Sequence, residues 1–131
     1  MTARKRVVEV ARRRTAPEVR EIRVRVMPDD DPDTSYLDQD EFADRRAEFD
    51  RGDFAFVGVR AEADVVVEGV LQTLTSGGMW GVESDSEEYI EDVALEEYDN
   101  LRDILKAVGV STSEVPVGTR EMIKPLIKWE A

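Results

Sequence analysis

The sequence has 131 residues, the size of a single domain. Charged residues make up 37% of it and hydrophobic residues 41%, a balance that predicts a thin core beneath a strongly charged surface. It contains no cysteine and no histidine, which excludes disulfides, thiolate and imidazole metal sites, and the commonest catalytic nucleophile and general base. We therefore expect a protein that is not an enzyme, with no catalytic residues and no cofactor.

The net charge of −12 is unevenly distributed. Residues 1–25 carry +6 and residues 26–131 carry −18. Such an acidic body disfavours direct binding to nucleic acid or anionic membranes, and it favours basic proteins, divalent cations or the chain's own basic start. No run approaches the length of an apolar membrane span, and no signal-peptide pattern follows the basic start, so we expect a soluble cytoplasmic protein.

Residues 1–15 are expected to form a basic N-terminal arm. Its cationic side chains are Arg4, Lys5, Arg6, Arg12, Arg13 and Arg14. Such arms bind phosphates, so nucleic-acid binding through the first 25 residues is one alternative function. The competing interpretation is a solvated terminus, or one that lies over the acidic body, because phosphate binding would have to overcome the repulsion of the remaining −18.

Residues 19–27 alternate between β-branched and charged side chains, which predicts a half-buried strand. After it, Asp29, Asp31, Asp33 and Asp40 match positions 1, 3, 5 and 12 of a calcium-binding loop. Divalent-cation binding is therefore a second alternative function, although the turn glycine of that loop is missing and a solvated acidic turn is the preferred interpretation.

A short helix is predicted near residues 39–51. Asp38 is placed to cap its start, Phe42, Arg46 and Phe49 share one face, and Gly52 follows its end. We expect the two aromatic side chains to belong to the core.

Residues 54–85 form the only long β-prone apolar stretch. Strands are predicted near 53–63, 66–75 and 79–83, with one turn around Asp64 and another at Ser76–Gly78. Gly69, inside the second of these strands, is expected to mark a bulge or a close backbone approach.

Residues 83–103 are the most acidic part of the chain, with ten Asp or Glu. A stripe of apolar residues predicts a helix near 95–108, preceded by a shorter helix and a break near Ala94; one long helix is the alternative. Acidic side chains stabilise a first helical turn, and we expect the rest to bind a partner together with the tryptophan just upstream. The predicted partner-binding residues are Trp80, Glu83, Asp85, Glu87, Glu88, Glu91, Asp92, Glu96 and Glu97.

The C-terminal residues 111–131 are predicted to extend a core domain of residues 16–110. Pro125 prevents an uninterrupted helix there. We expect this extension to pack back on the sheet; the alternative is that it carries Trp129 to a partner.

Three stretches also carry a resemblance to other proteins: residues 33–37 (DTSYL), 58–63 (GVRAEA) and 71–85 (LQTLTSGGMWGVESD). They resemble a set of small uncharacterised proteins encoded by phages, plasmids and integrated elements. The resemblance covers about residues 33–109 and leaves both ends outside it. Because that set has no established activity, the resemblance implies a genetic context and no mechanism.

Together these features predict an α+β fold, with a mainly antiparallel sheet of four strands packed against two or more helices. The function they favour is a non-enzymatic, acidic interaction module that binds a basic protein, such as a nucleic-acid-binding or host-defence protein, through DNA-like charge. Its predicted oligomeric state is a monomer or a homodimer.

Overall fold

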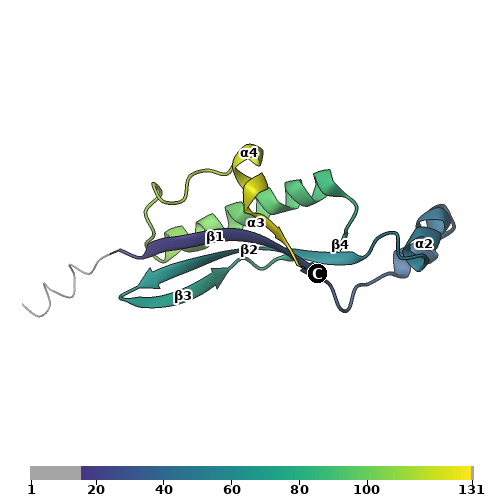
Figure 1. Cartoon of the computed structure of the whole chain (residues 1–131), viewed down its shortest axis with the longest axis horizontal. Helices are drawn as coiled ribbons and strands as arrows, with labels where there is room; N and C mark the ends of the chain where they lie inside the picture. The colour runs from purple at the N-terminus through teal and green to yellow at the C-terminus, as the bar shows by residue number, and fades with distance from the viewer. Residues whose placement is uncertain (1–15, 131) are drawn as a thin grey trace, which may run out of the picture.

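The computed structural model describes residues 16–130, which form an α+β fold with one long helix across a mostly antiparallel sheet (Figure 1). The predicted fold class is therefore confirmed. The strands are β1 (Glu18–Pro28), β2 (Phe56–Val67), β3 (Val70–Thr75), β4 (Met79–Glu83) and β5 (Ile127–Trp129). The first four agree with the predicted strands to within three residues at most boundaries, and β5 is an addition to them.

Strand β2 is the centre of the sheet. It pairs antiparallel with β1 on one side, and with β3 and β4, which lie end to end, on the other. The turn between β2 and β3 lies at Glu68 and Gly69, not at Asp64 as predicted. Both turn residues have positive φ, 52° and 80°, which is the signature of a two-residue hairpin turn. Gly69 therefore makes the turn, and the expectation of a bulge there was wrong.

The main core lies between the sheet and α3 (Glu87–Ala107). Because successive strand residues point to opposite faces, Val57, Val59 and Ala61 of β2 face the helix and are buried. The helix runs without the break predicted near Ala94. Ala94 is fully buried, and its small side chain and high helix propensity let the backbone pass close to the sheet without interruption.

The opposite face of the sheet carries a ladder of arginines and carboxylates. Glu62 is only 3% exposed, and it accepts hydrogen bonds from Arg23 Nε, Arg25 Nη1 and Arg60 Nη2 at 3.1, 2.9 and 2.6 Å. Arg23 also binds Asp64. Ion pairs of this kind let a charged face lie partly out of water.

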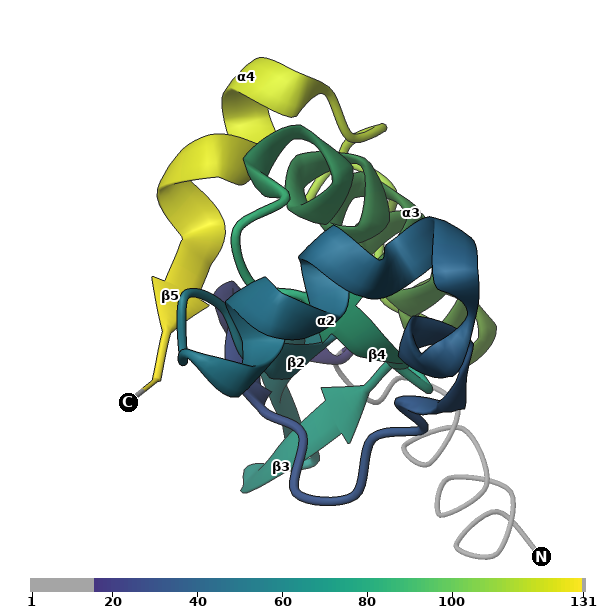
Figure 2. The same ribbon diagram turned by 90° about the vertical axis from the view of Figure 1, so that its right-hand side faces the viewer.

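A second, smaller core packs on that same face where β2 begins. It contains Leu37, Phe54 and Phe56, with Phe42 and Phe49 packed against them, which confirms the core role predicted for the last two. The helix predicted near 39–51 is shorter and irregular: two 3₁₀ turns, η1 (Ser35–Asp38) and η2 (Asp40–Phe42), precede α2 (Ala43–Asp50) (Figure 2). Asp38 ends η1 and caps no helix.

The C-terminal segment packs on the fold, as predicted. It forms α4 (Arg120–Ile123), then the 3₁₀ turn η3 (Lys124–Leu126), which contains Pro125, and then β5, which pairs parallel with β1 (Figures 1 and 2). Val115 and Ile123 are buried in the main core. Within residues 16–130 no helix is long and apolar enough to cross a membrane.

Candidate functional site

The outward face of α3 carries a continuous acidic stripe. Its members recur every three or four residues and so lie on one side of the helix: Glu88, Asp92, Glu96, Asp99 and Asp103, all exposed. At a rise of about 1.5 Å per residue the stripe is roughly 22 Å long. Among residues 16–130 only Asp92 of these five forms an ion pair, with Arg120. The other four carboxylates are available to an external cation.

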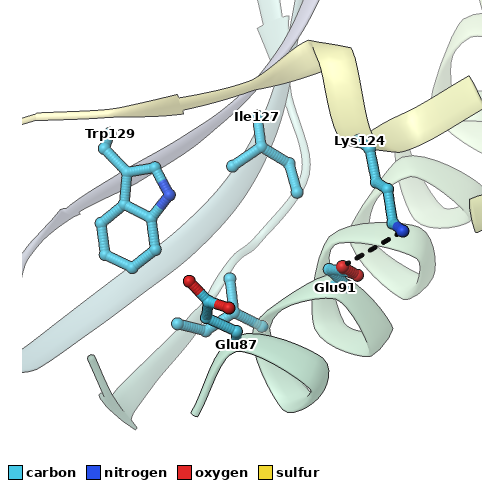
Figure 3. Close-up of a pocket in the computed structure, with 6 residues that line it drawn as sticks. Glu87, Glu91, Lys124, Ile127 and Trp129 are labelled. Carbon is cyan, nitrogen blue, oxygen red and sulfur yellow. Dashed lines mark ion pairs between the residues drawn. The ribbon is translucent and has the colours of Figure 1, made fainter. Parts of the chain in front are cut away.

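A pocket of about 240 Å³ opens beside the start of α3, where the C-terminal segment crosses it (Figure 3). It is lined by Glu87, Ile90 and Glu91 from the helix and by Lys124, Ile127 and Trp129 from the C-terminal segment. The two isoleucines supply apolar walls, the indole supplies an aromatic face, and both glutamates supply carboxylates. The volume is below the 300–1,000 Å³ typical of sites for drug-sized ligands, so the pocket suits one side chain or a small amine.

The charges in this pocket are unequally compensated. Glu91 lies 3.8 Å from Lys124 Nζ and 3.4 Å from Arg120 Nη1. Glu87, one turn earlier, is exposed and has no ion pair with any residue from 16 to 130. Figure 3 shows Glu87 and Trp129 toward one side of the pocket and the Lys124–Glu91 pair toward the other. The uncompensated carboxylate therefore lies on the aromatic side of the pocket.

This arrangement is complementary to a cationic side chain with an aliphatic stem. The stem of a lysine or arginine can cover Ile90 and Ile127, while its charged end reaches Glu87 and stacks on the Trp129 ring. A shallower hollow adjoins the pocket and shares Glu87 with it; its lining residues are Ser84, Asp85, Ser86, Glu87, Glu88, Tyr89 and Asp92. The two hollows extend the acidic surface around the start of α3.

The structure separates Trp80 from the acidic helix. A side chain at Gly58 would meet the Trp80 ring at 2.2 Å, so the indole lies directly over Gly58. Gly58 alternates with the core residues Val57 and Val59, and it therefore points away from α3. The prediction that Trp80 and the acids of α3 form one surface was wrong, because the sheet lies between them.

Glu83 and Asp85 are held within the fold by Arg45. This guanidinium binds Glu83 Oε2 at 3.1 Å and both carboxylate oxygens of Asp85, and it lies 3.7 Å from the centre of the Phe54 ring. Hydrogen bonds from Arg45 hold the pKa of the Asp85 carboxyl below its ordinary value. Burial, and then a hydrogen bond to Glu83, raise the pKa of Tyr36 to about 12. Both predicted partner-binding acids are thus already engaged by an internal cation, Arg45, which also binds Glu48.

Glu97 was also predicted to bind a partner, and the structure corrects this. It is 5% exposed, and its Oε1 accepts hydrogen bonds from the Ser76 hydroxyl at 2.9 Å and from the Gly78 amide at 2.6 Å. Because its carboxylate already ties α3 to the junction of β3 and β4, it is not accessible to another protein.

The four aspartates proposed as metal ligands do not form a site. Asp29 accepts hydrogen bonds from the Asp31 and Gly81 amides, and Asp33 accepts one from the Ser35 amide. Nowhere in the described part of the chain do three or more acidic side chains gather in a way that could hold a metal ion. Sequence spacing alone suggested the loop, but the carboxylates of Asp29 and Asp33 cap local turns instead.

Two groups of residues remain to be placed. The arm containing Arg4, Lys5, Arg6, Arg12, Arg13 and Arg14 lies outside the described residues. Ile127, Lys124 and Trp129, in contrast, were not in the predicted site, although they form half of the pocket. The period-two spacing of Ile127 and Trp129 after Pro125 was the available signal, since it places both side chains on one face of an extended segment.

Comparison with known proteins adds no further assignment. No family model matches the sequence, and no similar curated protein or solved structure was found. The candidate site therefore rests on its own geometry.

Proposed function

We propose that this protein is a non-enzymatic interaction module that binds a basic protein through the outward face of α3. The observation that carries the proposal is the pocket beside the start of that helix. It combines apolar walls, the Trp129 ring and the uncompensated Glu87 carboxylate, which is the chemistry that recognises a lysine or arginine side chain.

The acidic stripe extends this anchor into a surface. In the proposed complex one cationic side chain enters the pocket, and further cations lie along Glu88, Glu96, Asp99 and Asp103. Exposed charges of this kind contribute more to the rate and selectivity of association than to its strength, so the pocket supplies the specific contact. The resemblance to proteins of mobile elements makes a host nucleic-acid-binding protein the first partner to test.

The charge spacing defines how far the stripe can imitate DNA. Five carboxylates over about 22 Å give roughly one charge per 5 Å, whereas duplex DNA carries one per about 1.7 Å. We therefore propose a partner with a single basic helix or strand that fits along α3, in preference to a channel that encloses a whole duplex.

The proposal is tested by calorimetric titration with a lysine- and arginine-rich peptide. We expect binding at about 50 mM salt that weakens steeply by about 300 mM, because screening reduces the attraction between exposed charges. Glu87→Gln should weaken binding roughly 5- to 10-fold, about 1–1.4 kcal/mol. Glu114→Gln is the matched control, since Glu114 is exposed, lies outside the pocket and contributes the same charge.

The two variants separate the pocket from the overall charge. Equal weakening by Glu87→Gln and Glu114→Gln would mean that net charge alone attracts the peptide, and the pocket would then be rejected as the anchor. No binding of the unaltered protein at about 50 mM salt would dismiss the whole proposal.

A further inference from the structure

The outer edge of the sheet has an unusual sequence for this chain. Residues 69–82, which span β3 and β4, contain no charged side chain, although 37% of the whole sequence is charged. Strands at a sheet edge are normally protected by lysine or other charges, because their free backbone groups can pair with another chain. An edge left uncharged in so charged a protein indicates that it is covered in solution.

The two halves of this edge differ in whether side chains accept hydrogen bonds from their backbone amides. Alongside β4, the Gly78 and Gly81 amides donate to the Glu97 and Asp29 carboxylates. Along β3, no described side chain accepts a hydrogen bond from the backbone amides. Val70 and Leu71 are 57% and 62% exposed there. The open, unprotected part of the edge is therefore β3.

The hairpin fixes which groups of β3 point outward. The residues that close a two-residue hairpin, Val67 and Val70, exchange their backbone hydrogen bonds with each other. At the other end the Ser76 amide donates to the Ala61 carbonyl at 2.9 Å. Even-numbered residues thus bond inward to β2, and the amides and carbonyls of Leu71, Thr73 and Thr75 point outward.

We propose that β3 pairs antiparallel with β3 of a second copy of this chain, with the two-fold axis at Thr73. This register joins the two sheets into one. It places residues whose backbone amides and carbonyls point outward opposite each other, so that these groups can form hydrogen bonds between the two copies. Thr73 lies opposite Thr73 of the second copy, and Leu71 lies opposite Thr75 of the second copy. Threonine pairs and aliphatic–threonine pairs stabilise antiparallel neighbours, and the contact is isologous, as in most homodimers.

Charge selects a second copy over a basic partner for this edge. Cationic side chains gain nothing from a strand without carboxylates, and they are attracted to α3 instead. A second acidic copy, in contrast, can approach β3 without placing one carboxylate opposite another. The remaining repulsion between two chains of −12 each acts at longer range and is screened by salt. Dimerisation should therefore strengthen with salt, the reverse of the salt dependence of the proposed basic partner.

The register is tested by a single introduced thiol, because the natural chain has no cysteine. Thr73→Cys places two thiols opposite each other at the two-fold axis, where paired strands bring their Cα atoms within about 5.5 Å, a separation compatible with a disulfide. We expect a covalent dimer on mild oxidation. Val117→Cys is the matched control, because Val117 is 66% exposed and lies far from β3 in the sequence and outside the sheet.

The non-covalent dimer is tested by sedimentation equilibrium of the full chain at low and high salt. We expect a concentration-dependent dimer that strengthens with salt and is weakened at least tenfold by Leu71→Lys. That substitution reduces the net negative charge, so loss of the dimer would follow from the edge and not from repulsion. A monomer at all concentrations and salts, or equal crosslinking of Thr73→Cys and Val117→Cys, would overturn the proposal. A dimer that Leu71→Lys leaves intact would overturn it as well.

Discussion

At the scale of single residues, the Trp80 ring packs directly on Gly58, which is possible only because glycine has no side chain. Gly58 lies near the start of β2 without positive φ, so backbone conformation does not require glycine there. The requirement is space, because the Trp80 ring occupies the position that a Cβ atom would take. The indole covers the bare backbone of the central strand in place of the missing side chain.

Gly58→Ala should therefore displace Trp80 and destabilise the fold. We expect a loss of about 1–3 kcal/mol, typical of overpacking, with a change in Trp80 fluorescence measured in a Trp129→Phe background. Gly77→Ala is the matched control, because a Cβ atom there meets nothing within 4 Å. Comparable stability of the two variants would show that the Trp80 ring moves away without cost.

At the scale of elements, Glu97 explains how α3 and the β3–β4 edge are joined. Its carboxylate accepts hydrogen bonds from the Ser76 hydroxyl and the Gly78 amide, and the Ser76 hydroxyl in turn accepts one from the Ala61 amide. The chain between the two edge strands is thus fixed to both the helix and the central strand. Within the described residues no buried side-chain polar atom lacks a hydrogen-bond partner. At this junction Glu97 provides the acceptor for the buried Ser76 hydroxyl.

Removal of the Glu97 carboxylate should lower the free energy of unfolding. Glu97→Ala leaves the buried Ser76 hydroxyl without its acceptor and the partly buried Gly78 amide unsatisfied. We expect a loss of about 2–4 kcal/mol in urea unfolding, with faster amide hydrogen exchange at Gly78. Glu97→Gln keeps an acceptor oxygen and should cost less. The neighbouring Glu96→Ala should change stability by no more than about 0.5 kcal/mol, since Glu96 is exposed. A similar effect of both alanine substitutions would contradict this role.

The same elements show what sequence patterns can and cannot predict. The alternation in β1 and the apolar run of β2 predicted strands correctly, because both patterns follow directly from burial of one or two faces. The role of Glu97 was not predictable from its own surroundings in the sequence. It stands among nine other acids in residues 83–103, and only the packing of α3 against the strand junction distinguishes it from its neighbours.

The pocket was missed for a related reason. Glu87 belongs to the acidic segment, but Ile127 and Trp129 are about 40 residues further along the chain. Their proximity depends on the parallel pairing of β5 with β1, and a three-residue strand carries too little periodicity to predict its partner. Conversely, spacing alone suggested a calcium loop in residues 29–40. That suggestion was wrong because a spacing pattern does not show which carboxylates already accept hydrogen bonds from nearby backbone amides.

At the scale of the whole molecule, arginines on and beside the sheet pair with one group of acids, and most exposed acids of α3 have no such counterion. Glu62, Asp64 and Asp85 bind Arg23, Arg25, Arg45 or Arg60, whereas most carboxylates of the α3 stripe have no described partner. Four carboxylates without an ion pair to residues 16–130, Glu88, Glu96, Asp99 and Asp103, therefore lie on the side of the molecule where we place the basic partner.

This distribution also determines how stability depends on pH. Burial alone would raise the pKa of Glu62, but hydrogen bonds from Arg25 and Arg60 outweigh it and hold that pKa below the ordinary 4.5. The pKa values of Asp64 and Asp85 lie below the ordinary 3.8 because Arg23 and Arg45 bind them. A carboxyl with a lower pKa in the folded state stabilises the fold above its unfolded pKa, and this stabilisation is lost as the pH falls through the folded value.

We therefore expect the free energy of unfolding to be constant near neutral pH and to fall as the pH drops below about 4.5. Glu62→Gln should lower stability at pH 7 by roughly 2–4 kcal/mol, because it leaves three arginines without their shared anion while their partial exposure limits the cost. The variant should also lose less stability on acidification than the natural chain, since one of the titrating groups is gone. Urea unfolding at pH 7 and pH 3 measures both effects.

Glu41→Gln is the control, since Glu41 is exposed and has no ion pair among residues 16–130. An equal response of the two variants to acid would show that the arginine ladder does not couple protonation to folding.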